Sequence, residues 1–251
     1  PATLGLVALA LGVYSMKFPV DAAQAAAARG YAVGLRPLIM ASELMLITPA
    51  LLGLLLLRRP VAETLALRRD VNRGLIVASL CAGAALWAAS LGLLEVQSLF
   101  WPPSEAFLET FRQLHAALKP RNTLDAAFSI AAIALFPATC EEILFRGVVL
   151  PSLIRFLGGT GAVLASAFLF GIIHLDLAGG AVAFTRVPFA ILVGIGLGLL
   201  RVRTGSLLPP ILAHGVLNAI TFGTVLFTGL DMETQAPDAA LGAAMLLGGS
   251  V

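Results

Sequence analysis

Apolar residues along this chain gather in long runs rather than in strict alternation. A helix needs about 20 mainly apolar residues to cross a hydrocarbon core roughly 30 Å thick, whereas the strands of an outer-membrane barrel alternate in segments of about ten. The runs therefore exclude such a barrel and predict membrane-spanning helices. We expect seven or eight of them, and the run 123–157 fits either one tilted helix or two pieces broken at Pro137. The candidate spans are 2–16, 38–57, 74–94, 123–157, 162–175, 183–200, 207–227 and 239–251.

Two polar connections separate these runs. Residues 58–73 carry five arginines, so the positive-inside rule favours a cytoplasmic position for this connection and, by alternation, for the N-terminus. Residues 101–122 place large apolar residues at helical spacing, which fits either an interfacial helix under the headgroups or a solvated linker helix. The glycines at 194, 196 and 198 follow no predicted strand, so we interpret them as small residues that let membrane helices approach closely.

Composition agrees with a membrane protein. Hydrophobic residues make up 59% of the 251 residues and charged residues 12%, with a mean hydropathy of +0.97. A soluble domain has about 45–50% apolar and about 25% charged residues. A soluble globule, a disordered chain and a nucleic-acid binder with a basic face are excluded. The net charge of +2 is too small to imply an anionic partner, and two cysteines in apolar context do not make a disulfide framework.

The predicted fold is therefore an all-α, polytopic transmembrane helix bundle, an integral multi-pass protein with the lipid bilayer as its partner. We expect it in a prokaryotic plasma (inner) membrane. The sequence divides into N-terminal membrane helices with an interfacial helix (1–122), a core that carries the chemistry (123–228) and a C-terminal segment with a weak last helix (229–251).

Ionisable residues inside the apolar runs are the most informative ones. A charge at mid-membrane costs about 2.5–3.5 kcal/mol on insertion scales, so such residues need partners and usually have a function. Three clusters occur, and the outer members of each have i,i+4 spacing, which places them on one helix face. They are Glu141-Glu142 with Arg146, Phe170 with His174, and His214 with Asn218.

The first cluster supplies a candidate general base. Glu142 and Arg146 are spaced to pair within one helix, while Glu141 points about 100° away and is left to face a cavity. A carboxylate in such a site can act as a general base. The histidines and Asn218 are groups that can hold a water, donate to an oxyanion and protonate a leaving amine.

Each cluster also has a simpler interpretation. The Glu142–Arg146 pair fits a structural ion pair, and His174 fits a hydrogen-bonded histidine at a helix interface. His214 and Asn218 fit interhelical hydrogen bonds. Together, however, a glutamate pair, two histidines and an asparagine in so apolar a chain favour a site.

The order Glu-Glu-x-x-x-Arg, Phe-x-x-x-His, His-x-x-x-Asn resembles the CAAX-protease and bacteriocin-processing (CPBP, or Abi) family of intramembrane endopeptidases, over about residues 123–227. The resemblance implies a helical membrane protease whose catalytic cavity opens within the bilayer. By it, Glu141 activates water, His174 positions that water, and His214 and Asn218 form the oxyanion hole. Glu142, Arg146 and Phe170 would shape the site.

Cofactor use has two interpretations within that resemblance, because the family has been described both as glutamate-type and as metal-dependent. We favour a mechanism that uses no cofactor. Zinc is the alternative, with Glu141, His174 and His214 as its ligands. Other protease chemistries lack their motifs here, and Cys140, flanked by a carboxylate, fits packing better than a nucleophile.

The resemblance implies hydrolysis of a peptide bond in a membrane-anchored or lipidated protein or peptide, of the CAAX type or related C-terminal processing. The alternative is a non-catalytic membrane module, such as a bacteriocin-immunity or scaffold protein or a transporter-associated subunit. Residues 1–94 carry no motif that decides between them.

Overall fold

The computed structural model describes residues 32–67, 70–178 and 181–228. Helices dominate this part of the chain, which confirms the all-α class apart from one short hairpin, β1 (Asp176–Ala178) with antiparallel β2 (Ala181–Ala183). The helices of the first half are α3 (Ala32–Leu56), α4 (Val61–Thr64), α5 (Arg73–Phe100) and α6 (Glu105–Leu118). The second half contains α7 (Thr123–Ile130), η1 (Ala131–Leu135), α8 (Phe136–Glu142), η2 (Ile143–Val149), α9 (Leu150–Ile172), α10 (Val187–Thr204) and α11 (Leu208–Thr228).

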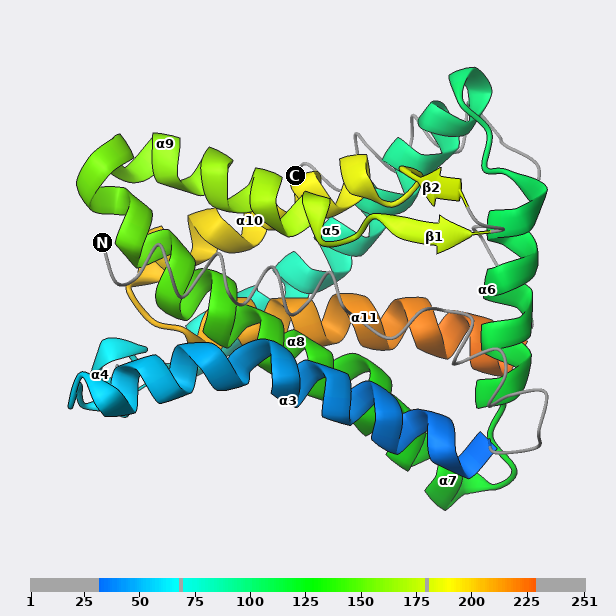
Figure 1. The fold of residues 1–251 in the computed structure, drawn as a ribbon, viewed down its shortest axis with the longest axis horizontal. Helices are drawn as coiled ribbons and strands as arrows, with labels where there is room; N and C mark the ends of the chain where they lie inside the picture. Colours follow the sequence, from blue (N-terminus) through cyan, green and yellow to red (C-terminus); the bar gives the residue numbers. More distant parts are fainter. Residues whose placement is uncertain (1–31, 68–69, 179–180, 229–251) are drawn as a thin grey trace.

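Four stretches of the described residues are long and apolar enough to cross a membrane: Leu35–Leu56, Arg73–Phe100, Thr123–Ile172 and Val187–Thr204. The expected count of seven or eight spans is therefore not confirmed. The first and last predicted spans, 2–16 and 239–251, lie outside the described residues. The predicted spans 123–157 and 162–175 lie on either side of a sharp turn at Gly158 within Thr123–Ile172, where φ is +67° (Figure 1).

Most of the helices run along a common direction, and α6 crosses it at one end of the bundle (Figure 1). This helix begins after Ser104, whose side chain accepts a hydrogen bond from the backbone N–H of Phe107. Phe107 and Leu118 are fully buried against the bundle, while Glu109 and Arg112 are exposed. The amphipathic pattern of residues 101–122 thus places one face of α6 on the ends of the other helices.

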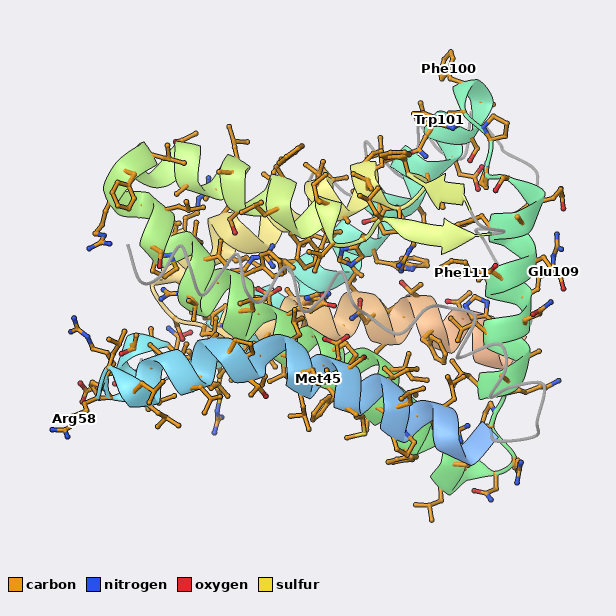
Figure 2. All side chains as sticks on the ribbon, in the orientation of Figure 1. Met45, Arg58, Phe100, Trp101, Glu109 and Phe111 are labelled. Carbon is orange, nitrogen blue, oxygen red and sulfur yellow. The ribbon has the colours of Figure 1, made fainter. Side chains whose placement is uncertain are left out.

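The outer surface of the bundle is apolar, as a lipid-facing surface requires. Met45 of α3 is 50% exposed and points away from the bundle, and Phe100 and Trp101 protrude beyond the end of α5 (Figure 2). Arg58 and Glu109 lie at opposite ends (Figure 2). Charged groups at the ends and apolar side chains between them are the arrangement of an integral membrane protein.

The core joins helices from both halves of the chain. Its largest cluster of buried side chains comes from α3, α8, η2, α9, α10 and α11, and includes Leu46, Cys140, Leu144, Phe145, Phe170, Val193, Leu197 and Leu217. Glycines allow the closest helix contacts. A Cβ on Gly194 would lie 2.9 Å from the Cα of Ala167, which confirms the packing interpretation of this glycine. A Cβ on Gly83 in α5 would collide with the carbonyl oxygen of Ala213 in α11.

Candidate active site

The two glutamates lie at the end of α8, between two π-helical segments. Pro137 lies in the first turn of this helix, which begins at Phe136, and has no backbone N–H to donate to the preceding turn. The segment before it, η1, is π-helical, as is η2 after Glu142. Of the two alternatives for 123–157, the continuous helix is the one observed, with a change of helix type near Pro137. Such π-helical insertions occur frequently at functional sites.

Glu142 and Arg146 form the predicted ion pair. Arg146 Nη1 donates to Glu142 Oε1 at 2.6 Å, and both side chains are completely buried. Arg146 Nη2 donates to the carbonyl oxygen of Gly194 at 2.9 Å, and Arg201 Nε donates to the carbonyl of Arg146 at 3.2 Å. The pair therefore ties α8 and η2 to α10.

His214 of α11 joins the two glutamates, although it lies 72 residues beyond Glu142. Its Nδ1 is 2.9 Å from Glu142 Oε1, and its Nε2 is 3.8 Å from Glu141 Oε2. Glu141 is 6% exposed and His214 4%. The contact with Glu142 through Nδ1 holds the ring with Nε2 toward Glu141.

Phe170 connects the second motif to this cluster. Its ring is 5.8 Å from that of His214 and 4.7 Å from that of His174, and the Arg146 guanidinium lies 4.7 Å from its centre. His174 Nδ1 donates to the carbonyl oxygen of Phe170 at 2.7 Å, which leaves the lone pair of the neutral ring on Nε2. Phe170 is 1% exposed and packs against both histidines and the arginine.

Asn218 lies one turn beyond His214 in α11. Its Nδ2 donates to the carbonyl oxygen of Ala134 in η1 at 3.4 Å, a long contact for an N–H···O hydrogen bond. The side chain is half-buried. Its role as an oxyanion donor stays a prediction, and its present bond is weak enough to be exchanged for another acceptor.

Zinc binding would need at least three His, Cys, Asp or Glu side chains that lie close together. In the ranges that the structure describes, no group of three or more His, Cys, Asp or Glu side chains is placed to hold a metal ion. The zinc alternative, with Glu141, His174 and His214 as ligands, stays a prediction.

All three motifs lie in the segment that a comparison with known families identifies. Residues 123–220 match the family model described as Rce1-like, type II CAAX prenyl endopeptidase. The match confirms the resemblance. No curated protein shows a significant match, and neither does any solved structure. At family level the Rce1-like segment, residues 123–220, supports a CAAX-type intramembrane protease with a membrane-associated substrate.

A third buried carboxylate, Glu43, lies outside the Rce1-like segment and outside the three motifs. It belongs to α3, is 3% exposed, and α3 packs against α8, the helix that carries Glu141 and Glu142. The signal that selected Glu141 was present here too, since Glu43 is an ionisable residue within the apolar run 38–57. Isoleucines occupy the positions four residues before and after it, so no spacing in the sequence marks Glu43 as part of a site.

Proposed function

We propose that this chain is an intramembrane endopeptidase of a prokaryotic plasma membrane, which hydrolyses a peptide bond of a membrane-anchored or lipidated substrate of the CAAX type. The observation that carries the proposal is the placement of His214 between Glu141 and Glu142, with Nδ1 held and Nε2 turned toward Glu141. A structural ion pair alone would need only Glu142 and Arg146.

The proposed base is Glu141. One water molecule can lie within hydrogen-bond distance of both its carboxylate and the His214 ring, because the two groups are 3.8 Å apart. The carboxylate takes one proton from the water as the oxygen attacks the substrate carbonyl carbon. It then gives that proton to the leaving amine as the C–N bond breaks. The products are a carboxylic acid and an amine, and Glu141 is a carboxylate again.

The tetrahedral intermediate carries a negative charge on the former carbonyl oxygen. His214, held by Glu142 through Nδ1, would donate to this oxygen through Nε2, with Asn218 as the second donor. His174, fixed by its bond to Phe170, helps to position the water.

The test uses the purified full chain and a lipidated reporter peptide, with products identified by mass spectrometry. Glu141→Gln should lower kcat by about 10²-fold or more, the usual contribution of a general base. Glu95→Gln is the matched control, because Glu95 is also buried, at 6% exposure, and lies outside the Rce1-like segment. Unchanged turnover in Glu141→Gln would remove the proposed base.

Two further outcomes bear on the alternatives. Activity that is lost with a chelator and restored by zinc would overturn the metal-free mechanism. Intact substrate after long incubation with the wild type, beside a preserved cellular phenotype in Glu141→Ala, would favour a non-catalytic membrane module.

A further inference from the structure

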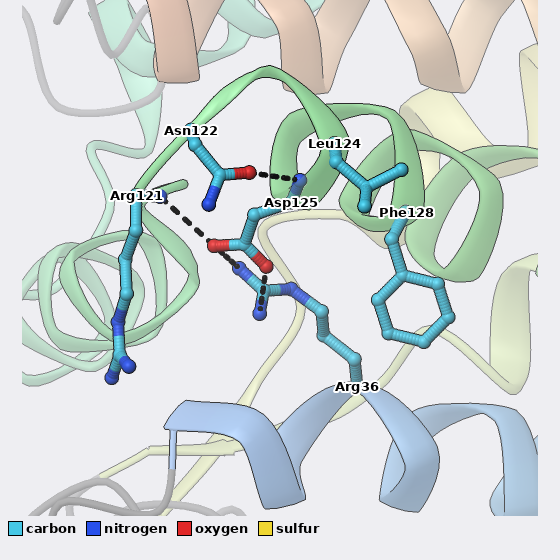
Figure 3. A pocket seen from close by; sticks show the side chains of 6 residues that line it. All are labelled: Arg36, Arg121, Asn122, Leu124, Asp125 and Phe128. Carbon is cyan, nitrogen blue, oxygen red and sulfur yellow. Dashed lines mark hydrogen bonds and ion pairs between the residues drawn. The ribbon is translucent and has the colours of Figure 1, made fainter.

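A second site lies away from the glutamates, where α3 begins and α6 gives way to α7. Here the side chains of Arg36, Arg121, Asn122, Leu124, Asp125 and Phe128 line a pocket of about 370 Å³ (Figure 3). The start of α3 and α7, which carry most of these residues, lie at the end of the bundle that α6 crosses (Figure 1). No residue of the three motifs belongs to it.

Arg36 is the centre of this pocket and is only 3% exposed. Its Nη1 pairs with Asp125 Oδ1 at 2.8 Å, and its Nη2 donates to the Leu118 carbonyl at 3.2 Å. The Nε–H has no hydrogen-bond partner among the described residues. A buried donor on a cation without an acceptor is unfavourable, so a ligand oxygen that reached this group would relieve that cost.

Arg121 adds a second cation. Its backbone N–H donates to Asp125 Oδ2 at 2.9 Å, which uses more of the acceptor capacity of that carboxylate. Its exposed guanidinium forms no ion pair with any residue that the structure describes. Two arginines and one aspartate give the pocket a local charge of +1, although the chain as a whole is nearly balanced.

The remaining wall is apolar and faces outward. Leu124 is 81% exposed and Phe128 is 43% exposed, and their i,i+4 spacing puts them on one face of α7. Leu135, 50% exposed, is farther along the same continuous helical stretch. Cations at the end of a membrane-spanning stretch, followed by an exposed apolar face, match a ligand with an anionic head and an apolar tail.

We infer that this pocket binds the phosphodiester headgroup of an anionic phospholipid, with the acyl chains along Leu124 and Phe128. Arginine forks suit phosphate oxygens, and basic side chains near a membrane surface attract anionic lipids. A free phosphate would use the cations but would leave the apolar wall without a partner. The inference is independent of the proposed peptidase.

The test is native mass spectrometry of the full chain released from detergent, with the affinity for added phosphatidylglycerol and phosphatidylcholine measured separately. Arg121→Gln should weaken phosphatidylglycerol binding about fivefold and leave phosphatidylcholine unchanged, since one basic group near a membrane is worth a factor of that order. Arg121→Lys should retain most of the affinity. Arg36→Lys, which keeps the charge opposite Asp125 but removes Nε, should also weaken phosphatidylglycerol binding.

Arg112→Gln is the matched control, because Arg112 lies at the same end of the bundle, on α6, and is exposed but paired with Glu109. An equal loss of phosphatidylglycerol affinity in this control would show general surface attraction and overturn the site. Equal binding of the two lipids by the wild type would do the same. Displacement of the lipid by millimolar inorganic phosphate would assign the pocket to a free anion instead.

Discussion

Replacement of Arg146 by methionine tests the ion pair at the centre of the candidate site. The change removes the arginine partner of Glu142, a carboxylate at 0% exposure that keeps only its contact with His214, and it removes the hydrogen bond to the Gly194 carbonyl. Breaking a buried pair by removal of one partner destabilises a protein by about 3–5 kcal/mol. We therefore expect Arg146→Met to lower the free energy of unfolding by about that amount, measured by equilibrium unfolding in mixed micelles.

The second half of the experiment removes both charges. Arg146→Met with Glu142→Gln should be more stable than Arg146→Met alone, because no uncompensated charge remains in the core. A double-mutant cycle on the exposed pair Arg112–Glu109, whose side chains are 46% and 54% exposed, should give about 0–1 kcal/mol. A coupling energy for the buried pair no larger than that of the exposed pair would refute this reasoning.

The remaining predictions concern packing and titration. Gly194→Ala should lower the free energy of unfolding by about 1–3 kcal/mol, because its Cβ would press on the Ala167 backbone. Gly159→Ala is the control and should change the free energy of unfolding little, because the space around Gly159 is open. Equal effects in the two variants would argue against close packing at Gly194. The pKa of Glu109 is lowered by hydrogen bonds from Gln113 and then from Arg112. This carboxylate therefore supports α6 above its unfolded pKa and loses that effect as pH falls through the lowered value. An NMR titration should show Gln113→Ala raising the pKa toward the ordinary value, and an unmoved titration would contradict this cause.

Local features of the site follow from the sequence, because helical spacing fixes them. The i,i+4 separation of Glu142 and Arg146 was enough to predict their pairing, and the structure has it at 2.6 Å. The apolar runs likewise predicted the bounds of α3, α5, α10 and α11 to within about six residues. Both results depend only on residues close in the chain.

Long-range features do not follow in the same way. The contact of His214 with Glu142 joins α11 to α8, and its distance depends on how several helices pack rather than on any spacing. The π-helical segments η1 and η2 change which residues share a helix face. The spacing of apolar residues in the sequence does not predict this change. Arg36 pairs with Asp125, which is 89 residues away in the sequence, so the burial of Arg36 could not be predicted from local spacing either.

The close approach of α5 and α11 makes the geometry of residues 123–220 depend on a helix outside that segment. Gly83 lies outside the Rce1-like segment, yet its missing side chain leaves room for the Ala213 carbonyl, the residue just before His214. A chimera that grafts residues 123–220 onto foreign N-terminal helices would keep every motif residue. It would hold His214 against the two glutamates only if the graft also presents a glycine to Ala213.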